Sequence, residues 1–352
     1  MRYKIFGRRT GLRVSEVALG TGNFGTSWGH GAEPAESRKI FDLYAEAGGN
    51  FIDTADGYQF GQAEQLLGDF LATSRDQFVL ATKFTLGSTG KEGISTTGNS
   101  RKTMTYALEA SLKRLKTDRI DLYWVHFADG VTPMEEILRG FDDLVRSGKI
   151  LYAGLSNFPA WRIARADLMA ELRGWAPLAG VQVEYSLAER TADRELLPMI
   201  EALGLGGAFW SPLGGGFLTG KYRQSDEGRL KGFGGQLVHT ETDQQKTAIL
   251  DTVLAVAGEL GVTPLEVAIA WLHEKAARST TSLIPILGSR SAEQLKPTLA
   301  ALKLKLSPEQ VTRLDEVSAV KLGVPHEAIQ GVVPRVLGGQ AELVDLPVVP
   351  VA

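Results

Sequence analysis

The chain has 352 residues, of which 43% are hydrophobic and 22% are charged, and its formal net charge is −3. These values are typical of a globular protein with a substantial core, and they give no reason to expect a nucleic-acid partner. The absence of cysteine excludes disulfides and thiolate metal sites, and no apolar run approaches the roughly 20 residues that cross a bilayer. The N-terminus also lacks the apolar core of a signal peptide, so we expect a cytoplasmic protein with no membrane partner.

A predicted β-hairpin in residues 1–15 precedes a regular alternation of strands and helices. The eight strand candidates lie near residues 16–20, 50–53, 78–83, 120–126, 150–156, 179–184, 206–211 and 283–287. Strands that alternate with amphipathic helices indicate a parallel sheet, and eight of them in one uninterrupted chain favour an α/β fold of the (β/α)8 TIM barrel type. The sequence therefore predicts one barrel domain over residues 1–322, with its hairpin at the bottom and long loops at the C-terminal face.

Two regions depart from this alternation. The interval between the seventh and eighth strands contains a glycine-rich stretch, Phe217–Gly235, and at least one additional helix. We expect a long loop over the barrel mouth there. Beyond residue 322 the chain becomes rich in Pro, Gly and Val, which predicts an extended C-terminal tail over 323–352.

Helix starts are indicated at three places by a hydroxyl residue followed by proline. The strings Thr263–Glu266 and Ser307–Gln310 have the spacing of a capping box. In the third, Thr132 is predicted to cap a helix over residues 133–146, whose apolar residues recur at helical spacing.

Four polar side chains lie at or just after the ends of three successive strands: Asp53, Tyr58, Lys83 and His126. Loops at that end of a parallel barrel converge, so these side chains are expected to meet. Tyr58 is a weak acid, with a reference pKa of about 10. An ammonium beside it favours the phenolate, and a carboxylate keeps that ammonium charged, so Asp53, Lys83 and Tyr58 can form a proton-donating chain. Any one of these residues alone would be interpreted as structural, but the set favours reduction of a carbonyl, with His126 orienting its oxygen.

These residues and the strings around them resemble the aldo-keto reductases over roughly residues 3–320. The matching strings are Gly49–Ala55, Ser111–Leu115 with Asp118, Ile120–Leu122 and Gly148–Ile150. The resemblance implies that Asp53, Tyr58, Lys83 and His126 are the catalytic tetrad. It implies NADPH-dependent reduction of aldehydes or ketones to alcohols, with Tyr58 as the proton donor.

The resemblance also implies where the cofactor binds. Residues matching Ser156, Asn157 and Gln182 hydrogen-bond the nicotinamide carboxamide in the family, and Trp210 matches the aromatic residue under the ring. The stretch Ser211–Lys221 resembles the pyrophosphate loop, and Ile286–Leu295 resembles the segment that binds the 2′-phosphate. The expected cofactor residues are Gly20, Thr21, Asn23, Ser156, Asn157, Gln182, Trp210, Ser211, Pro212, Leu213, Gly214, Gly216, Lys221, Gly288, Ser289, Arg290 and Gln294.

Arg290 suits bidentate contact with a phosphate, and this favours NADPH as the cofactor. A departure follows, because Thr298, after Pro297, stands where relatives usually carry asparagine, and this weakens the expected adenine contact. No Gly-x-Gly-x-x-Gly fingerprint opens a βαβ unit, so a Rossmann site is not expected.

The candidate walls of the substrate pocket are aromatic residues near the strand ends, together with Trp210. They are Phe24, Trp28, Phe84 and Phe127. Each could equally serve packing, but together they suit a small, flat, apolar carbonyl substrate. The stretch Asp118–Pro159 resembles the aryl-alcohol-dehydrogenase-like branch, which implies aromatic aldehydes.

Two alternatives remain open at the level of sequence. The same barrel with bound NADPH serves as a β subunit of channels, which is a binding module with little turnover. A metal-dependent barrel hydrolase would need clusters of His and Asp at strand ends, and only one of the five histidines lies at such an end, so we expect no metal. The sequence leaves open the physiological substrate, the direction of the reaction and the oligomeric state. A homo-oligomer is one alternative for that state.

Overall fold

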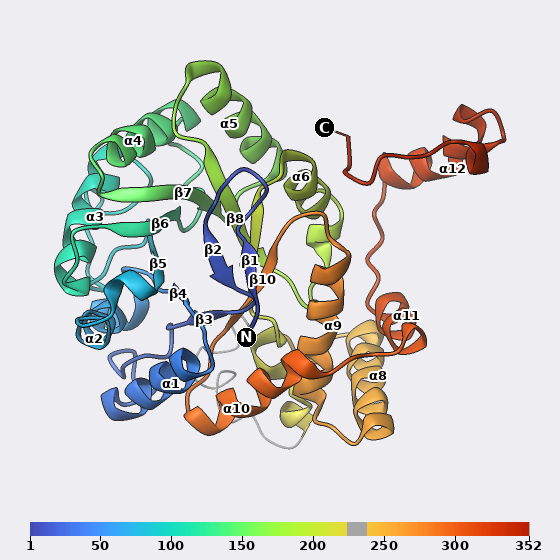
Figure 1. The fold of residues 1–352 in the computed structure, drawn as a ribbon, viewed down its shortest axis with the longest axis horizontal. Helices are drawn as coiled ribbons and strands as arrows, with labels where there is room; N and C mark the ends of the chain where they lie inside the picture. Colours follow the sequence, from blue (N-terminus) through green and yellow to red (C-terminus); the bar gives the residue numbers. More distant parts are fainter. Residues whose placement is uncertain (224–237, 352) are drawn as a thin grey trace.

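A computed structural model of the protein describes residues 1–223 and 238–351. Eight parallel strands close into a barrel in the order β10-β3-β4-β5-β6-β7-β8-β9, which confirms the predicted (β/α)8 fold (Figure 1). The barrel strands are β3 (Ala18–Gly20), β4 (Phe51–Asp53), β5 (Val79–Phe84), β6 (Ile120–Val125), β7 (Ile150–Ser156), β8 (Leu178–Glu184), β9 (Gly206–Trp210) and β10 (Leu283–Leu287). Each of them overlaps its predicted range.

Helices cover the outside of the barrel. They are α1 (Pro34–Glu46), α2 (Gln62–Phe70), α3 (Arg101–Leu115), α4 (Met134–Arg146), α5 (Ala160–Arg173), α6 (Leu196–Leu203), α8 (Gln244–Leu260), α9 (Pro264–Arg278), α10 (Ala292–Ala300) and α11 (Pro308–Val317). The additional helix predicted before the last strand is present, since α8 and α9 both lie between β9 and β10. Of the predicted long loop, residues 224–235 lie outside the described residues. No single described helix is long and apolar enough to cross a membrane, and only the pair α8 and α9, bent by 99°, reaches that length and composition together.

All three predicted helices are present, but only two of their three predicted caps are confirmed. Complete capping boxes form at Thr263 and Ser307. At α4 the capping position is held by Pro133, without a side-chain hydrogen bond. Thr132 is not available as the cap, because Asp129 accepts hydrogen bonds from both its backbone N–H and its hydroxyl.

The N-terminal hairpin closes one end of the barrel. Its strands β1 (Tyr3–Ile5) and β2 (Arg13–Ser15) pair antiparallel, and Phe6 follows β1. The Phe6 ring packs edge-to-face on Phe51 at the start of β4 and on Trp124, at 5.6 and 6.3 Å between centroids. A Cβ at Gly180 would lie 2.5 Å from this ring, so the neighbouring strand needs glycine there. With the N-terminal end filled by these rings, the C-terminal face is the end that carries a cavity.

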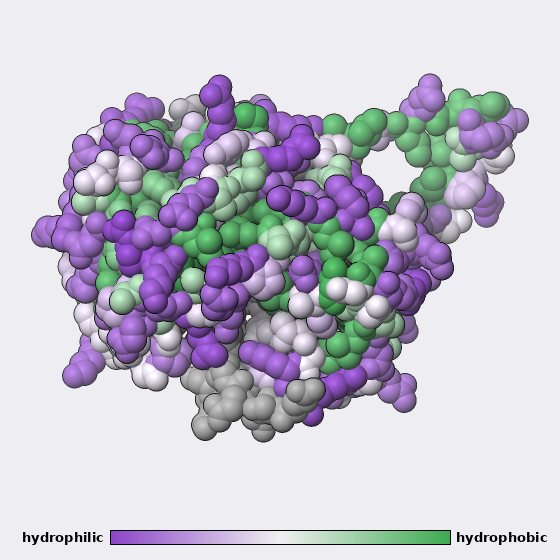
Figure 2. Space-filling model, turned by 60° about the horizontal axis from the view of Figure 1, so that its bottom comes forward, coloured by the Kyte–Doolittle hydropathy of each residue, from purple (hydrophilic) through white to green (hydrophobic). Residues whose placement is uncertain are grey.

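The C-terminal tail is partly helical, so the prediction of an extended segment over 323–352 is wrong for α12 (His326–Val336). Its first turn is stabilised locally, because the carboxylate of Glu327 accepts a hydrogen bond at 3.1 Å from the backbone N–H of Gly323. The helix stands off from the barrel and leaves apolar side chains such as Ile329 and Val336 exposed (Figure 1; Figure 2).

Candidate active site

Asp53, Tyr58 and Lys83 meet at the C-terminal ends of β4 and β5. The fully buried ammonium of Lys83 donates to Asp53 Oδ2 at 2.6 Å, to the carbonyl of Thr54 at 2.8 Å and to the phenolic oxygen of Tyr58 at 3.1 Å. All three protons of this ammonium therefore have an acceptor. The structure thus brings together the carboxylate, the ammonium and the phenol, as their positions near the strand ends predicted.

The charge on Lys83 is maintained by its neighbours. Burial alone lowers the pKa of Lys83, but the charges of Asp53 and Tyr58 and their hydrogen bonds outweigh it and raise the pKa above its ordinary value. Asp53 is itself held at its second oxygen, which accepts a hydrogen bond at 2.9 Å from the amide of Gln182. A fixed positive charge thus lies beside the phenolic oxygen of Tyr58, where it stabilises a phenolate.

His126, at the end of β6, faces the same point. Its ring lies edge-to-face with Tyr58 at 5.9 Å and stacks on Phe127 at 4.7 Å between centroids. Burial, together with the positive charge of Lys83, keeps the pKa of His126 well below its usual range. The imidazole is therefore neutral near pH 7 and adds a polar group to the site without adding a charge.

A cavity of about 440 Å³ opens over these residues at the C-terminal face. The predicted residues that line it are Asp53, Tyr58, His126, Gly20, Asn23, Trp28, Phe127, Asn157, Gln182, Trp210, Ser211, Pro212 and Gly288. A second cavity of about 290 Å³ shares Ser211, Pro212 and Gly288 with the first. It is lined by further predicted residues, namely Leu213, Gly216, Lys221, Ser289, Arg290 and Gln294. The two cavities therefore adjoin at these shared residues, and together they are called the cleft, with Tyr58 at one end and Arg290 at the other.

Two of the predicted pocket aromatics do not line this cleft, and their assignment is corrected. Phe84 is fully buried and stacks on Tyr123, with 5.1 Å between ring centroids. Successive side chains of a strand point to opposite faces, so Phe84 packs under the helices because its neighbour Lys83 points into the barrel. Phe24 is also fully buried and packs edge-to-face on Phe70 of α2, at 6.2 Å.

Three predicted cofactor residues lie buried beside the cleft without lining it. The hydroxyl of Thr21 donates to the carbonyl of Asp53 at 3.2 Å, and the hydroxyl of Ser156 accepts from the amide of Asn157 at 3.1 Å. Gly214 is buried in the turn that follows β9. These residues hold the shape of the cleft.

The substrate end of the cavity includes residues that the sequence analysis missed. Phe60, Leu86 and Glu92 line it, together with Gly57, Gly87 and Gly90. A usable signal was present, because residues 85–93 directly follow β5 and therefore form a loop at the C-terminal face, where barrel enzymes build their sites.

Backbone strain is concentrated at this face. Six non-glycine residues in the described part of the chain have a positive φ, and five of them follow barrel strands at the C-terminal end. These five are Gln59, Phe60, Thr85, Asn157 and Ser211. Such conformations cost free energy and tend to collect at functional sites, so their placement supports the assignment of the cleft.

The groups along the cleft fit a dinucleotide with phosphates. The Trp210 indole is held by a 3.0 Å hydrogen bond to the side chain of Asn157, which donates in turn to the carbonyl of His126 at 2.9 Å. At the far end, Arg290 precedes α10, and no carboxylate among the described residues pairs with its guanidinium. One end of the cleft therefore offers a fixed aromatic wall, and the other end offers a cation that no described carboxylate compensates.

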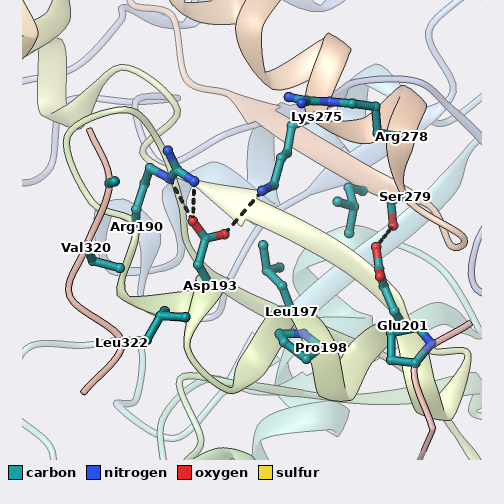
Figure 3. A pocket seen from close by; sticks show the side chains of 13 residues that line it. Arg190, Asp193, Leu197, Pro198, Glu201, Lys275, Arg278, Ser279, Val320 and Leu322 are labelled. Atoms are coloured by element: carbon teal, nitrogen blue, oxygen red, sulfur yellow. Dashed lines mark hydrogen bonds and ion pairs between the residues drawn. The ribbon is translucent and has the colours of Figure 1, made fainter. Parts of the chain in front are cut away.

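A further cavity, of about 490 Å³, lies outside the barrel between α6 and α9 (Figure 3). Its carboxylate Asp193 pairs with Arg190 at 2.6 Å and with Lys275 at 3.5 Å. Val320 and Leu322, from the chain beyond α11, line one side of it. Because these charged groups are engaged with one another, we assign this cavity to packing and the cleft over Tyr58 to function.

Comparison with known proteins decides the family. Residues 16–319 match the model of the Aldo/keto reductase family. The chain belongs to the aldo/keto reductase family. A norsolorinic acid reductase of Aspergillus flavus is 34% identical over 333 residues, which are 92% of this chain and 82% of the relative. An aryl-alcohol dehydrogenase [NADP(+)] of Phanerodontia chrysosporium is 35% identical over 339 residues, or 90% of this chain and 86% of the relative.

A third relative, an uncharacterized oxidoreductase of Bacillus subtilis, is 37% identical over 326 residues, which are 90% of this chain and 96% of the relative. The resemblance inferred from the sequence is thereby confirmed. This aldo/keto reductase is an oxidoreductase that acts on carbonyl or alcohol groups with a nicotinamide cofactor.

Proposed function

We propose that this protein reduces aldehydes or ketones with aromatic or other apolar groups to alcohols, using NADPH and with Tyr58 as the proton donor. The observation that carries the proposal is the 3.1 Å hydrogen bond between Lys83 Nζ and the Tyr58 phenol at the floor of the cavity. It couples a weak acid to a buried positive charge at the point where a substrate oxygen would lie.

The reaction divides between the cofactor and the protein. When bound, NADPH supplies a hydride to the carbonyl carbon. Tyr58 gives its phenolic proton to the carbonyl oxygen as negative charge develops there, and Lys83 stabilises the phenolate that remains. Asp53 keeps Lys83 charged and in place. The neutral ring of His126 donates to the same oxygen and orients it.

The preference for NADPH rests on the far end of the cleft. Arg290 and Ser289 line it just before α10, where a 2′-phosphate accepts charge-assisted hydrogen bonds. NADH lacks this phosphate and leaves the guanidinium without a partner. The printed name of the Phanerodontia relative, which specifies NADP(+), agrees with this choice.

The preference for apolar, flat substrates rests on the walls of the cavity. Trp28, Phe60, Phe127 and Trp210 line it, and the Trp28 ring lies edge-to-face with Tyr58 at 6.1 Å. Aromatic walls of this kind favour a planar ring beside the reacting carbonyl. Relatives named aryl-alcohol dehydrogenase point to the same class.

The proposal is tested by a panel of aromatic and aliphatic aldehydes, run side by side with NADPH and with NADH while the absorbance of the reduced cofactor is followed. We expect turnover of aromatic aldehydes with NADPH and much slower turnover with NADH. Tight NADPH binding with no turnover of any carbonyl compound would refute the proposal in favour of a binding module like the channel β subunits.

A further inference from the structure

The loop that follows β5 forms the outer wall of the substrate end of the cavity. Glu92 from this loop lines the cavity together with Leu86 and with Phe60 from the neighbouring loop. The side chain of Glu92 folds back under the loop, since a Cβ at Gly87 would lie 2.1 Å from its Cγ. Gly87 also has a φ of +83°, so both its conformation and this close approach require glycine.

The Glu92 carboxylate is held in a defined place by the loop backbone. Its Oε1 accepts hydrogen bonds from the backbone N–H groups of Thr89 and Gly90, the latter at 3.1 Å. Partial burial raises the pKa of Glu92, but the hydrogen bonds from Thr89 and Gly90 lower it by more. The pKa of Glu92 therefore lies below its usual range. Glu92 is therefore ionised at neutral pH.

Among the described residues, no cation compensates this charge within the cavity. In the described part of the chain no lysine, arginine or histidine side chain forms an ion pair with Glu92. The other carboxylate that lines the cavity, Asp53, is neutralised by Lys83, and His126 is neutral. The substrate end thus combines apolar aromatic walls with one negative charge.

We propose that Glu92 determines specificity by charge, so that the site accepts neutral or cationic aromatic carbonyl compounds and discriminates against those that carry a carboxylate. The inference rests on the proposed function, because it concerns the substrate of the same site. Like charges brought together in a cavity of reduced dielectric repel each other, and this repulsion weakens as salt is added. A substrate carboxylate that approaches Glu92 finds no cation among the described residues that offsets this repulsion.

The test compares 4-carboxybenzaldehyde with its methyl ester, which is similar in shape but has no charge. We expect the wild-type kcat/KM to favour the ester by about fivefold or more at low ionic strength. Glu92→Gln should reduce this ratio about fivefold, chiefly through a lower KM for the acid. Salt at roughly 0.5 M, where the Debye length is about 4 Å, should reduce the ratio of the wild type in the same way.

Glu171→Gln is the matched control, because it makes the same change in net charge at an exposed position of α5. It should leave the ratio unchanged. A wild type that reduces both aldehydes equally well, or a ratio that Glu92→Gln and Glu171→Gln change equally, would overturn the inference.

A second readout separates this inference from the proposed function. If the wild type reduces neither aldehyde, the proposed function fails, and binding of the two product alcohols to the NADPH-saturated protein decides the question. Weaker binding of 4-(hydroxymethyl)benzoate than of its methyl ester, with no such difference in Glu92→Gln, would support the inference that Glu92 discriminates by charge. Equal binding of the two alcohols would contradict it.

Discussion

The buried side-chain carboxamide of Gln59 accepts a hydrogen bond at 2.9 Å from the backbone N–H of Trp28. The same carboxamide donates to the carbonyls of Gly22 and His30, at 3.1 and 3.0 Å. Gln59 directly follows Tyr58 and has a φ of +52°. Its hydrogen bonds therefore connect the first βα loop to the turn that carries Tyr58. The position of Trp28 over the cavity therefore depends on a residue that does not line it.

Replacing Gln59 by leucine should loosen the Trp28 loop while leaving the cofactor cleft intact. We expect the free energy of unfolding to fall by about 2–3 kcal/mol, because three partly buried backbone groups lose their partners. The KM for aromatic aldehydes should rise about tenfold, the effect of about 1.4 kcal/mol on substrate binding, with the NADPH dissociation constant unchanged. Gln65→Leu, at an exposed position of α2, is the control. An unchanged KM in a destabilised Gln59→Leu would assign Gln59 to the fold alone.

Asp56 should make the stability of the protein depend on pH. Its side chain is 2% exposed, and Oδ1 has no hydrogen-bond partner among the described residues. Burial and the charge of Glu64 raise the pKa of Asp56 to about 7, from an ordinary value of 3.8. Between these two values the folded protein holds a proton that the unfolded chain has released, so stability falls as the pH rises through this window.

Asp56→Asn should remove this dependence. Relative to the wild type, the free energy of unfolding of the variant should increase as the pH rises from 5 to 7, and this increase should level off at about 2–3 kcal/mol above pH 7. Urea unfolding at pH 5, 6, 7 and 8 measures it. A difference between the two proteins that stays constant across this range would show that Asp56 is not protonated in the folded state.

The strands could be predicted from the sequence, and so could the contact among Asp53, Tyr58 and Lys83, because both depend on local sequence patterns. Short apolar runs define the strands, and in a parallel barrel all strand ends converge, so residues such as Asp53 and Lys83 meet whatever the details of packing. Capping signals were reliable where the hydroxyl residue had no competing partner, as at Ser307. They failed at Thr132, which binds Asp129 instead.

The walls of the pocket could not be predicted in the same way, because they depend on tertiary contacts. One position along a strand separates Lys83, which points into the barrel, from Phe84, which packs against the helices. Phe60 and Glu92 reach the cavity through loops whose path is set by positive φ angles and by glycine contacts. No periodic pattern encodes such loops.

Arg290→Ala should separate the two nicotinamide cofactors. A charge-assisted hydrogen bond contributes roughly 1.5–3 kcal/mol, so the variant should lose about one to two decades of affinity for NADPH. The affinity for NADH should be almost unchanged, because NADH has no group that uses this charge. Titrations of protein fluorescence with each cofactor measure both constants. Lys296→Ala, at an exposed position of α10, the helix that follows Arg290, is the control for loss of a positive charge. Equal losses for both cofactors would show that Arg290 does not bind the 2′-phosphate.

The most direct test of the account is a single-turnover measurement of aldehyde reduction by Tyr58→Phe that is saturated with NADPH. The phenylalanine keeps the ring that packs against His126 and removes only the hydroxyl that is bonded to Lys83. If Tyr58 is the proton donor, the rate of cofactor oxidation should fall by at least about 10²-fold, while the NADPH dissociation constant hardly changes. A near-normal rate in Tyr58→Phe would contradict the assignment of Tyr58 as the proton donor.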